Sequence, residues 1–132
     1  MGFGLNNILL DTHALYWWLG DRKLLSAAAR QAIEDPRNRA LVSAATAWEI
    51  AIKHRLGKLR AGQIVTDFER ILDEEGFAEL PITTVHALHV GSIKGTNKDP
   101  FDQLLAAQAQ LEHLPIVSVD KFFDRQGVQR IW

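Results

Sequence analysis

Short apolar segments that alternate with helix-like stretches constrain the fold of this chain most strongly. The apolar segments occupy residues 8–10, 40–43, 77–80, 116–119 and 128–132. They are rich in aliphatic residues, as strands are, and most are apolar throughout instead of alternating with polar residues. Strands with this pattern are buried on both faces, as in a parallel sheet covered by helices on both sides. The sequence therefore predicts an α/β fold, a single three-layer α/β/α domain over residues 1–132 with a mostly parallel central sheet.

Amphipathic stretches between the apolar segments predict the helices that cover this sheet. We expect helices over residues 12–19, 26–34, 45–57, 63–74, 84–93 and 102–111. In the third of these, Trp48, Ile52 and Leu56 follow helical spacing. Ser26 is a typical N-cap, and Gly57 lies where a helix would end.

Composition and charge limit the classes of function. Of the 132 residues 47% are hydrophobic and none is cysteine, which permits a full core and excludes disulfides, zinc–thiolate sites and thiol nucleophiles. The chain shows no secretory signal and no apolar run of the roughly 20 residues that span a bilayer, so we expect a cytoplasmic protein without membrane contact. The net charge of −1 is low for a protein that grips nucleic acid by its backbone alone. Any such contact would be local, or assisted by an ion that the chain binds.

Two of the apolar segments end in an aspartate. Asp11 follows residues 8–10, and Asp120 follows residues 116–119. The carboxyl ends of parallel strands meet at one edge of the sheet, where ligands bind in such folds. We therefore expect both carboxylates at one site, to which the acids of two predicted helices, Glu49 and Asp102, can contribute.

Each acid also has a purely structural explanation. Asp99 and Asp102 stand at the start of a predicted helix, where the macrodipole favours a carboxylate by about 0.3–1 kcal/mol. Glu49 can pair with Lys53 four residues later, which is worth about 0.2–0.5 kcal/mol. Asp120 can begin a turn. The residues alone support a shared site and a set of independent structural carboxylates about equally.

Convergence of these acids would call for a cation. Like charges held close together repel, and some of the acids would take up protons unless a positive charge compensated them. Carboxylate oxygens are ligands of Mg²⁺ or Mn²⁺, which keep several waters and accept substrate phosphates. One or two such ions can activate a water and stabilise the leaving oxygen of a phosphodiester.

Four longer stretches surround the candidate acids. They are ILLDTHAL from Ile8, SAATAWEIAIK from Ser43, DPFDQLLAAQA from Asp99 and VSVD from Val117. In this order they resemble the PIN domain, and more narrowly the VapC-type toxins of bacterial toxin–antitoxin pairs, over residues 8–128. The resemblance implies a metal-dependent endoribonuclease that cleaves RNA, forms a homodimer and is bound by a cognate antitoxin protein.

The resemblance also implies roles for individual residues. The residues that would hold one or two Mg²⁺ or Mn²⁺ ions and support catalysis are Asp11, Glu49, Asp102 and Asp120. It places Thr12, Asp99 and Ser118 behind them, where a hydroxyl can bond to a carboxylate or a phosphate. Asn97 and Gln103 depart from the usual His-Arg-Asp-Pro-Phe-Asp-Arg form of the third stretch. Gln103 replaces a cation, which concerns the grip on substrate more than the metal ligands.

Other features leave alternatives open. Lys53, Arg55 and Lys98 can contact RNA, but they can equally be solvated residues. His86 and His89 have no third ligand at a compact spacing, so we expect surface or partly buried histidines instead of a zinc site. A phosphotransferase with an aspartate nucleophile is a competing enzyme class. A further alternative is a catalytically idle PIN-like binding module whose acidic pocket is occupied by a partner protein.

Overall fold

A parallel sheet forms the centre of the protein, whose computed structural model describes residues 6–95 and 98–132. The five strands are β1 (Asn6–Leu10), β2 (Asn38–Ser43), β3 (Ala78–Leu80), β4 (Ile116–Val117) and β5 (Arg130–Ile131). They lie in the order β3-β2-β1-β4-β5, and every neighbouring pair is parallel. The predicted α/β class and its parallel sheet are confirmed.

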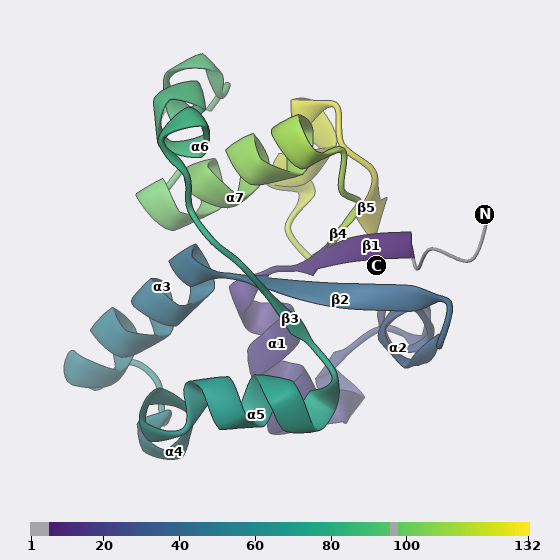
Figure 1. Cartoon of the computed structure of the whole chain (residues 1–132), viewed down its shortest axis with the longest axis vertical. Coiled ribbons are helices and arrows are strands. Elements are labelled where there is room, and N and C mark those ends of the chain that lie inside the picture. Colours follow the sequence, from purple (N-terminus) through teal and green to yellow (C-terminus); the bar gives the residue numbers. More distant parts are fainter. Residues whose placement is uncertain (1–5, 96–97) are drawn as a thin grey trace.

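Helices cover both faces of this sheet (Figure 1). They are α1 (Thr12–Leu19), α2 (Ala27–Glu34), α3 (Ala44–Arg55), α4 (Gly62–Thr66), α5 (Phe68–Glu75), α6 (Thr84–His89) and α7 (Pro100–Glu112), with short 3₁₀ turns η1 (Arg22–Leu24), η2 (Val90–Ser92) and η3 (Lys121–Gln126). Helices α6 and α7 lie above the sheet in Figure 1, α1, α2, α4 and α5 lie below it, and α3 extends beyond the strand ends. The three predicted layers are therefore present.

Strand β1 shows how the apolar pattern builds two cores. Successive side chains of a strand point to opposite faces of the sheet. Ile8 and Leu10 accordingly join the core beneath α1 and α2, whereas Leu9 joins the core beneath α7. All three are almost fully buried. A strand in this position needs an apolar residue at every place, which explains why its sequence does not alternate.

Two predictions about the helices need correction. The expected helix over residues 63–74 is two helices, because the chain bends at Asp67 between α4 and α5. The bend lets Ile64 and Phe68 pack against the same core from two short helices. Helix α3 is present, but the apolar stripe through Trp48 and Leu56 faces outward, with these side chains 51% and 58% exposed. Helix α3 extends past the strand ends, and its buried residues are Ala45, Thr46, Glu49 and Ile50.

The remaining differences lie at element ends. Strand β4 stops at Val117, so the predicted strand over residues 116–119 is shorter than expected. Helix α6 ends at His89 and continues only as a 3₁₀ turn. Within the described ranges, the longest helix has 13 residues and none could cross a bilayer.

Candidate active site

The four predicted site acids line one cavity at the carboxyl edge of the sheet. The cavity has a volume of about 290 Å³, and its walls include Asp11, Glu49, Asp102 and Asp120. Thr12, Asp99, Lys53 and Lys98 also line it. The acids come from the end of β1, the middle of α3, the first turn of α7 and the loop after β4. Parallel strand order therefore gathers residues that lie far apart in the sequence, as predicted.

Asp11 is held by the backbone at the start of α1. It caps this helix, and its Oδ1 atom accepts the Ala14 N–H at 2.7 Å. Its own N–H donates to the Val117 carbonyl at 3.1 Å, which ties it to β4. Burial raises the pKa of Asp11, against the lowering effect of a hydrogen bond from Ser118 and of the Ala14 N–H. The side chain thus combines a capping role with a buried position in which its ionised form is disfavoured.

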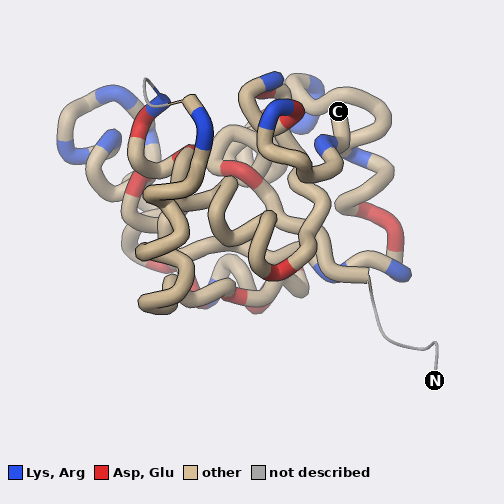
Figure 2. Tube along the Cα trace, turned by 90° about the horizontal axis from the view of Figure 1, so that it is seen from above, with Lys and Arg blue, Asp and Glu red and all other residues tan. Residues whose placement is uncertain are grey.

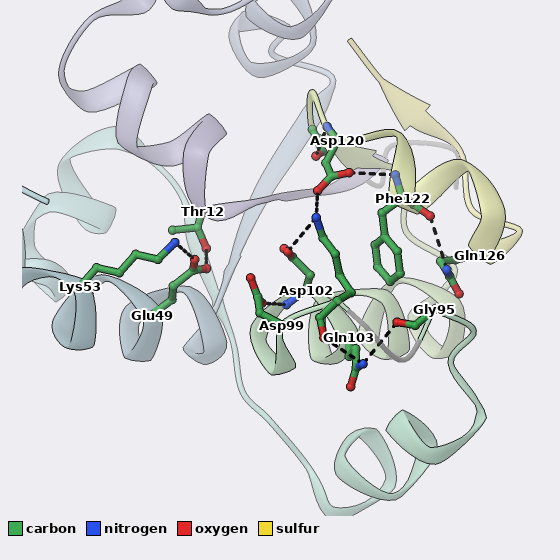
Figure 3. Close-up of polar contacts among 12 residues, drawn as sticks. Thr12, Glu49, Lys53, Gly95, Asp99, Asp102, Gln103, Asp120, Phe122 and Gln126 are labelled. Carbon is green, nitrogen blue, oxygen red and sulfur yellow. Dashed lines mark hydrogen bonds and ion pairs between the residues drawn. The ribbon is translucent and has the colours of Figure 1, made fainter. Parts of the chain in front are cut away.

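Glu49 on α3 also lines the cavity, and Figure 3 shows its contacts with Thr12 and Lys53. It is only 3% exposed. The Thr12 hydroxyl donates to its Oε1 atom at 2.6 Å, and the Lys53 ammonium donates to its Oε2 atom at 2.5 Å. The Glu49–Lys53 pair expected from their spacing is therefore present. Both oxygens of this buried carboxylate have a donor, which keeps the negative charge tolerable inside the protein.

Lys98 connects the other two acids. Its ammonium group pairs with Asp120 and lies 3.5 Å from Asp102 (Figure 3). Burial, together with the charges of Asp99 and Glu49, raises the pKa of Asp102 to about 7, although Lys98 opposes the shift. Burial also acts to raise the pKa of Asp120, but hydrogen bonds from Lys98 and the Phe122 N–H help to bring it below its usual value.

Asp99 and Gln103 organise the start of α7. Asp99 caps the helix and accepts the Asp102 N–H at 2.9 Å, as the helix N-terminal explanation predicts. The Gln103 amide donates to the carbonyl of Lys98 at 3.1 Å. Gln103 therefore holds the backbone of Lys98 in place, at a position where the usual sequence form has an arginine. The other unusual residue, Asn97, lies outside the described residues.

The donors suit a hard divalent cation. Carboxylate oxygens are the preferred ligands of Mg²⁺ and Mn²⁺, and the Lys98 ammonium already occupies a cationic position between two of them. In residues 6–95 and 98–132, however, no three His, Cys, Asp or Glu side chains stand close enough together to hold an ion as they are. Ligation by all four acids thus stays a prediction.

The predicted RNA-binding cations separate into two groups. Lys53 and Lys98 line the cavity, whereas Arg55 is exposed at the end of α3 and does not. Sequence reasoning missed the contact of Lys98 with two site acids. The four-residue spacing from Lys98 to Asp102 was the one available signal.

Figure 2 shows Lys and Arg segments interleaved with Asp and Glu segments around the molecule, consistent with the small net charge.

The comparisons with known proteins identify the family. The sequence profile of the PIN domain matches residues 8–128. The chain belongs to the PIN-domain family. This PIN domain is 32% identical over 110 residues to ribonuclease VapC22 of Mycobacterium tuberculosis, covering 83% of this chain and 82% of that protein.

Solved structures share the fold of this PIN domain. DNA-bound VapBC from Salmonella typhimurium matches with a TM-score of 0.66 and 22% identity, over 96% of both chains. VapBC-1 from nontypeable Haemophilus influenzae matches with a TM-score of 0.65 and 19% identity, over 94% of this chain and 96% of that one. At these identities the structures establish the common fold, while the closer sequence relative bears on activity.

Proposed function

We propose that this PIN domain is a VapC-type endoribonuclease that depends on Mg²⁺ or Mn²⁺. The observation that carries the proposal is the cavity at the carboxyl edge of the sheet, where Asp11, Glu49, Asp102 and Asp120 come together. A family whose relative at 32% identity is a ribonuclease supports the same reaction. The catalytically idle binding module is not favoured by this membership.

The four acids would hold one or two cations. A bound divalent ion supplies an activated water and stabilises the leaving oxygen of a phosphodiester. The remaining work falls to the chain. The Thr12 hydroxyl orients one oxygen of Glu49, and the Ala14 N–H orients one oxygen of Asp11. Because both carboxylates are buried, their positions are set before substrate arrives, which lowers the cost of ordering the site.

Two lysines give the acidic cavity a local attraction for RNA. Lys53 and Lys98 both line the cavity, and their side chains are 29% and 30% exposed. A partly exposed ammonium group can contact a backbone phosphate at the cavity mouth. Such contact is local, as a net charge of −1 requires.

An antitoxin protein is the proposed partner. The solved structures with this fold include VapBC assemblies, and two of them contain DNA. By analogy we place this PIN domain as the toxin of a toxin–antitoxin pair in the cytoplasm, as a homodimer. Co-expression with the product of a neighbouring gene, followed by purification, tests this part of the proposal. A chain that inhibits cell growth equally with and without every such co-expressed protein would contradict it.

RNA cleavage with and without EDTA tests the proposed reaction. Wild type should cleave in Mg²⁺ or Mn²⁺ and stop in EDTA, and Asp102→Asn should be inactive in both. Asp124→Asn is the matched control, because Asp124 pairs with Arg130 away from the cavity. Equal cleavage by wild type and Asp102→Asn, with or without EDTA, would indicate a contaminant and refute the assignment.

A further inference from the structure

A buried polar network joins the two helices that carry Glu49 and Asp102. Its centre is Gln108 on α7, whose side chain is completely buried. The Oε1 atom of Gln108 accepts the Ser43 hydroxyl at 2.5 Å. Its Nε2 atom donates to the Pro81 carbonyl at 3.2 Å and lies 3.3 Å from His86 Nδ1. Burying an amide costs free energy unless its oxygen and its NH₂ group are hydrogen-bonded, so these contacts are needed to keep Gln108 in the interior.

Ser43 carries the network to α3. It is the last residue of β2 and the N-cap of α3, and its Oγ atom accepts the Ala45 N–H at 3.0 Å. A hydroxyl has one proton, so Ser43 donates to Gln108 while it accepts from Ala45. Glu49 lies six residues after Ser43 on α3, and Asp102 lies six residues before Gln108 on α7. The Ser43–Gln108 bond therefore links the two helices within two turns of both acids.

His86 determines which way the Gln108 amide points. The Nδ1 atom of His86 accepts the Thr83 N–H at 3.0 Å, so its Nε2 atom bears the proton and donates to Glu112 at 3.2 Å. The NH₂ group of Gln108 thus faces two acceptors, and its carbonyl oxygen faces the one hydroxyl donor. A reversed amide would turn its carbonyl oxygen toward the Pro81 carbonyl and the unprotonated His86 Nδ1, and it would lose both of these bonds. His86 is only 3% exposed, which corrects the expectation of a surface or partly buried histidine.

A glutamine is the side chain that this position requires. A carboxylate can accept from Ser43 but cannot donate to Pro81, and an apolar side chain can do neither. Gln110, two residues further along α7, bonds instead to the Gln126 carbonyl at 2.8 Å and to His89 at 2.7 Å. These contacts lie away from α3. The two glutamines therefore differ in which part of the protein they hold in place.

We infer that Gln108 is a positioning residue for the proposed nuclease site. By bonding to Ser43 it holds α3 against α7 so that Glu49 and Asp102 face one cavity. A substitution far from the chemistry that misplaces a site group by about 1 Å can lower activity by about 100-fold. The inference rests on the proposed function for its cleavage readout, whereas helix protection and Mg²⁺ binding test it without RNA.

Gln108→Met is the test variant, because it keeps the volume of the side chain and removes its hydrogen bonds. We expect Mg²⁺ affinity, measured by titration calorimetry, and kcat for RNA each to fall about 10-fold or more. KM for RNA should change less than twofold, since Gln108 does not reach the cavity. Amide hydrogen exchange should accelerate in α3 but not in α2. Gln110→Leu, which loses two hydrogen bonds on the same helix, should leave Mg²⁺ affinity and kcat unchanged.

The outcomes separate this inference from the proposed function. Unchanged α3 exchange and Mg²⁺ affinity in Gln108→Met would overturn the positioning role, whether or not the protein cleaves RNA. If the wild type never cleaves RNA but Gln108→Met binds Mg²⁺ more weakly than the wild type does, the nuclease proposal fails and the positioning role stands. If the wild type binds no Mg²⁺, the exchange of α3 decides alone. If Gln108→Met does not fold, Ser43→Ala removes the other partner of the same bond, and the same losses are expected.

Discussion

Replacing Asp102 by asparagine should stabilise the metal-free protein at neutral and alkaline pH. The Asp102 side chain is 18% exposed, and burial with the nearby charges of Asp99 and Glu49 raises its pKa to about 7. In the unfolded chain the carboxyl group titrates near its ordinary value of 3.8. Between these two values the folded protein retains a proton that the unfolded chain has lost.

The sign and size of the effect follow from this difference in proton binding. The folded state binds more protons than the unfolded state between pH 3.8 and about 7. This carboxyl group therefore makes the free energy of unfolding fall as the pH rises through that interval. Its contribution is complete below pH 3.8 and lost above about pH 7. At about 1.4 kcal/mol per pKa unit, the ceiling at pH 8 is about 4 kcal/mol. Solvent screening of a partly exposed group reduces the expected gain to about 1–3 kcal/mol.

Urea denaturation in EDTA at pH 5 and pH 8 measures this gain. Asp102→Asn should exceed wild type by about 1–3 kcal/mol at pH 8 and by less than half of that at pH 5. Asp124→Asn is the control, because its hydrogen bond with Arg130 lowers the pKa of Asp124 and its loss should not stabilise the protein. An Asp102→Asn variant no more stable than wild type at pH 8 would refute the reasoning that Lys98 compensates this buried charge only in part.

Three further predictions concern two residues of the site and the end of helix α5. Asp11→Asn should abolish cleavage and raise the metal-free Tm, because burial raises the pKa of Asp11; a lower Tm in EDTA would contradict the buried-charge argument. Lys98→Met should lower metal-free stability but tighten Mg²⁺ binding in calorimetry, because no internal cation then competes for Asp102 and Asp120; weaker Mg²⁺ binding would count against it. Gly76→Ala should cost about 1–2 kcal/mol in urea denaturation, because φ is 75° there, with cleavage unchanged.

Local sequence patterns predicted most of the strands and helices and the parallel order of the sheet. The unbroken apolar run before Asp11 indicated a strand buried on both faces, and β1 is such a strand. The parallel order followed, because buried strands alternated with helices. Asp11, which follows that strand, then indicated that a site lies at the carboxyl ends of the strands. These inferences succeeded because a strand's burial pattern and a helix's periodicity are encoded by neighbours in the sequence.

Element ends and exposed faces were less predictable. The bend at Asp67 and the outward face of Trp48 both contradict a simple reading of helical spacing. Spacing reports that a helix has an apolar stripe, but not which surface is available to receive it. Trp48 packs edge-on against Phe101 with ring centroids 4.7 Å apart, so its partner comes from another helix. Only the packing of α3 against α7 decides such a contact.

The sequence by itself determined the α/β architecture and the candidate acids, Asp11 and Asp120 first among them. Tertiary structure alone decided the contacts between residues far apart in the chain. Lys98 lies 22 residues from Asp120 in the chain, and Ser43 lies 65 residues from Gln108. The strand-ending aspartates depend on short-range periodicity, which the chain carries openly. The contact of Lys98 with Asp120 and the buried bond between Ser43 and Gln108 depend on how separate elements pack together, and no local pattern encodes that packing.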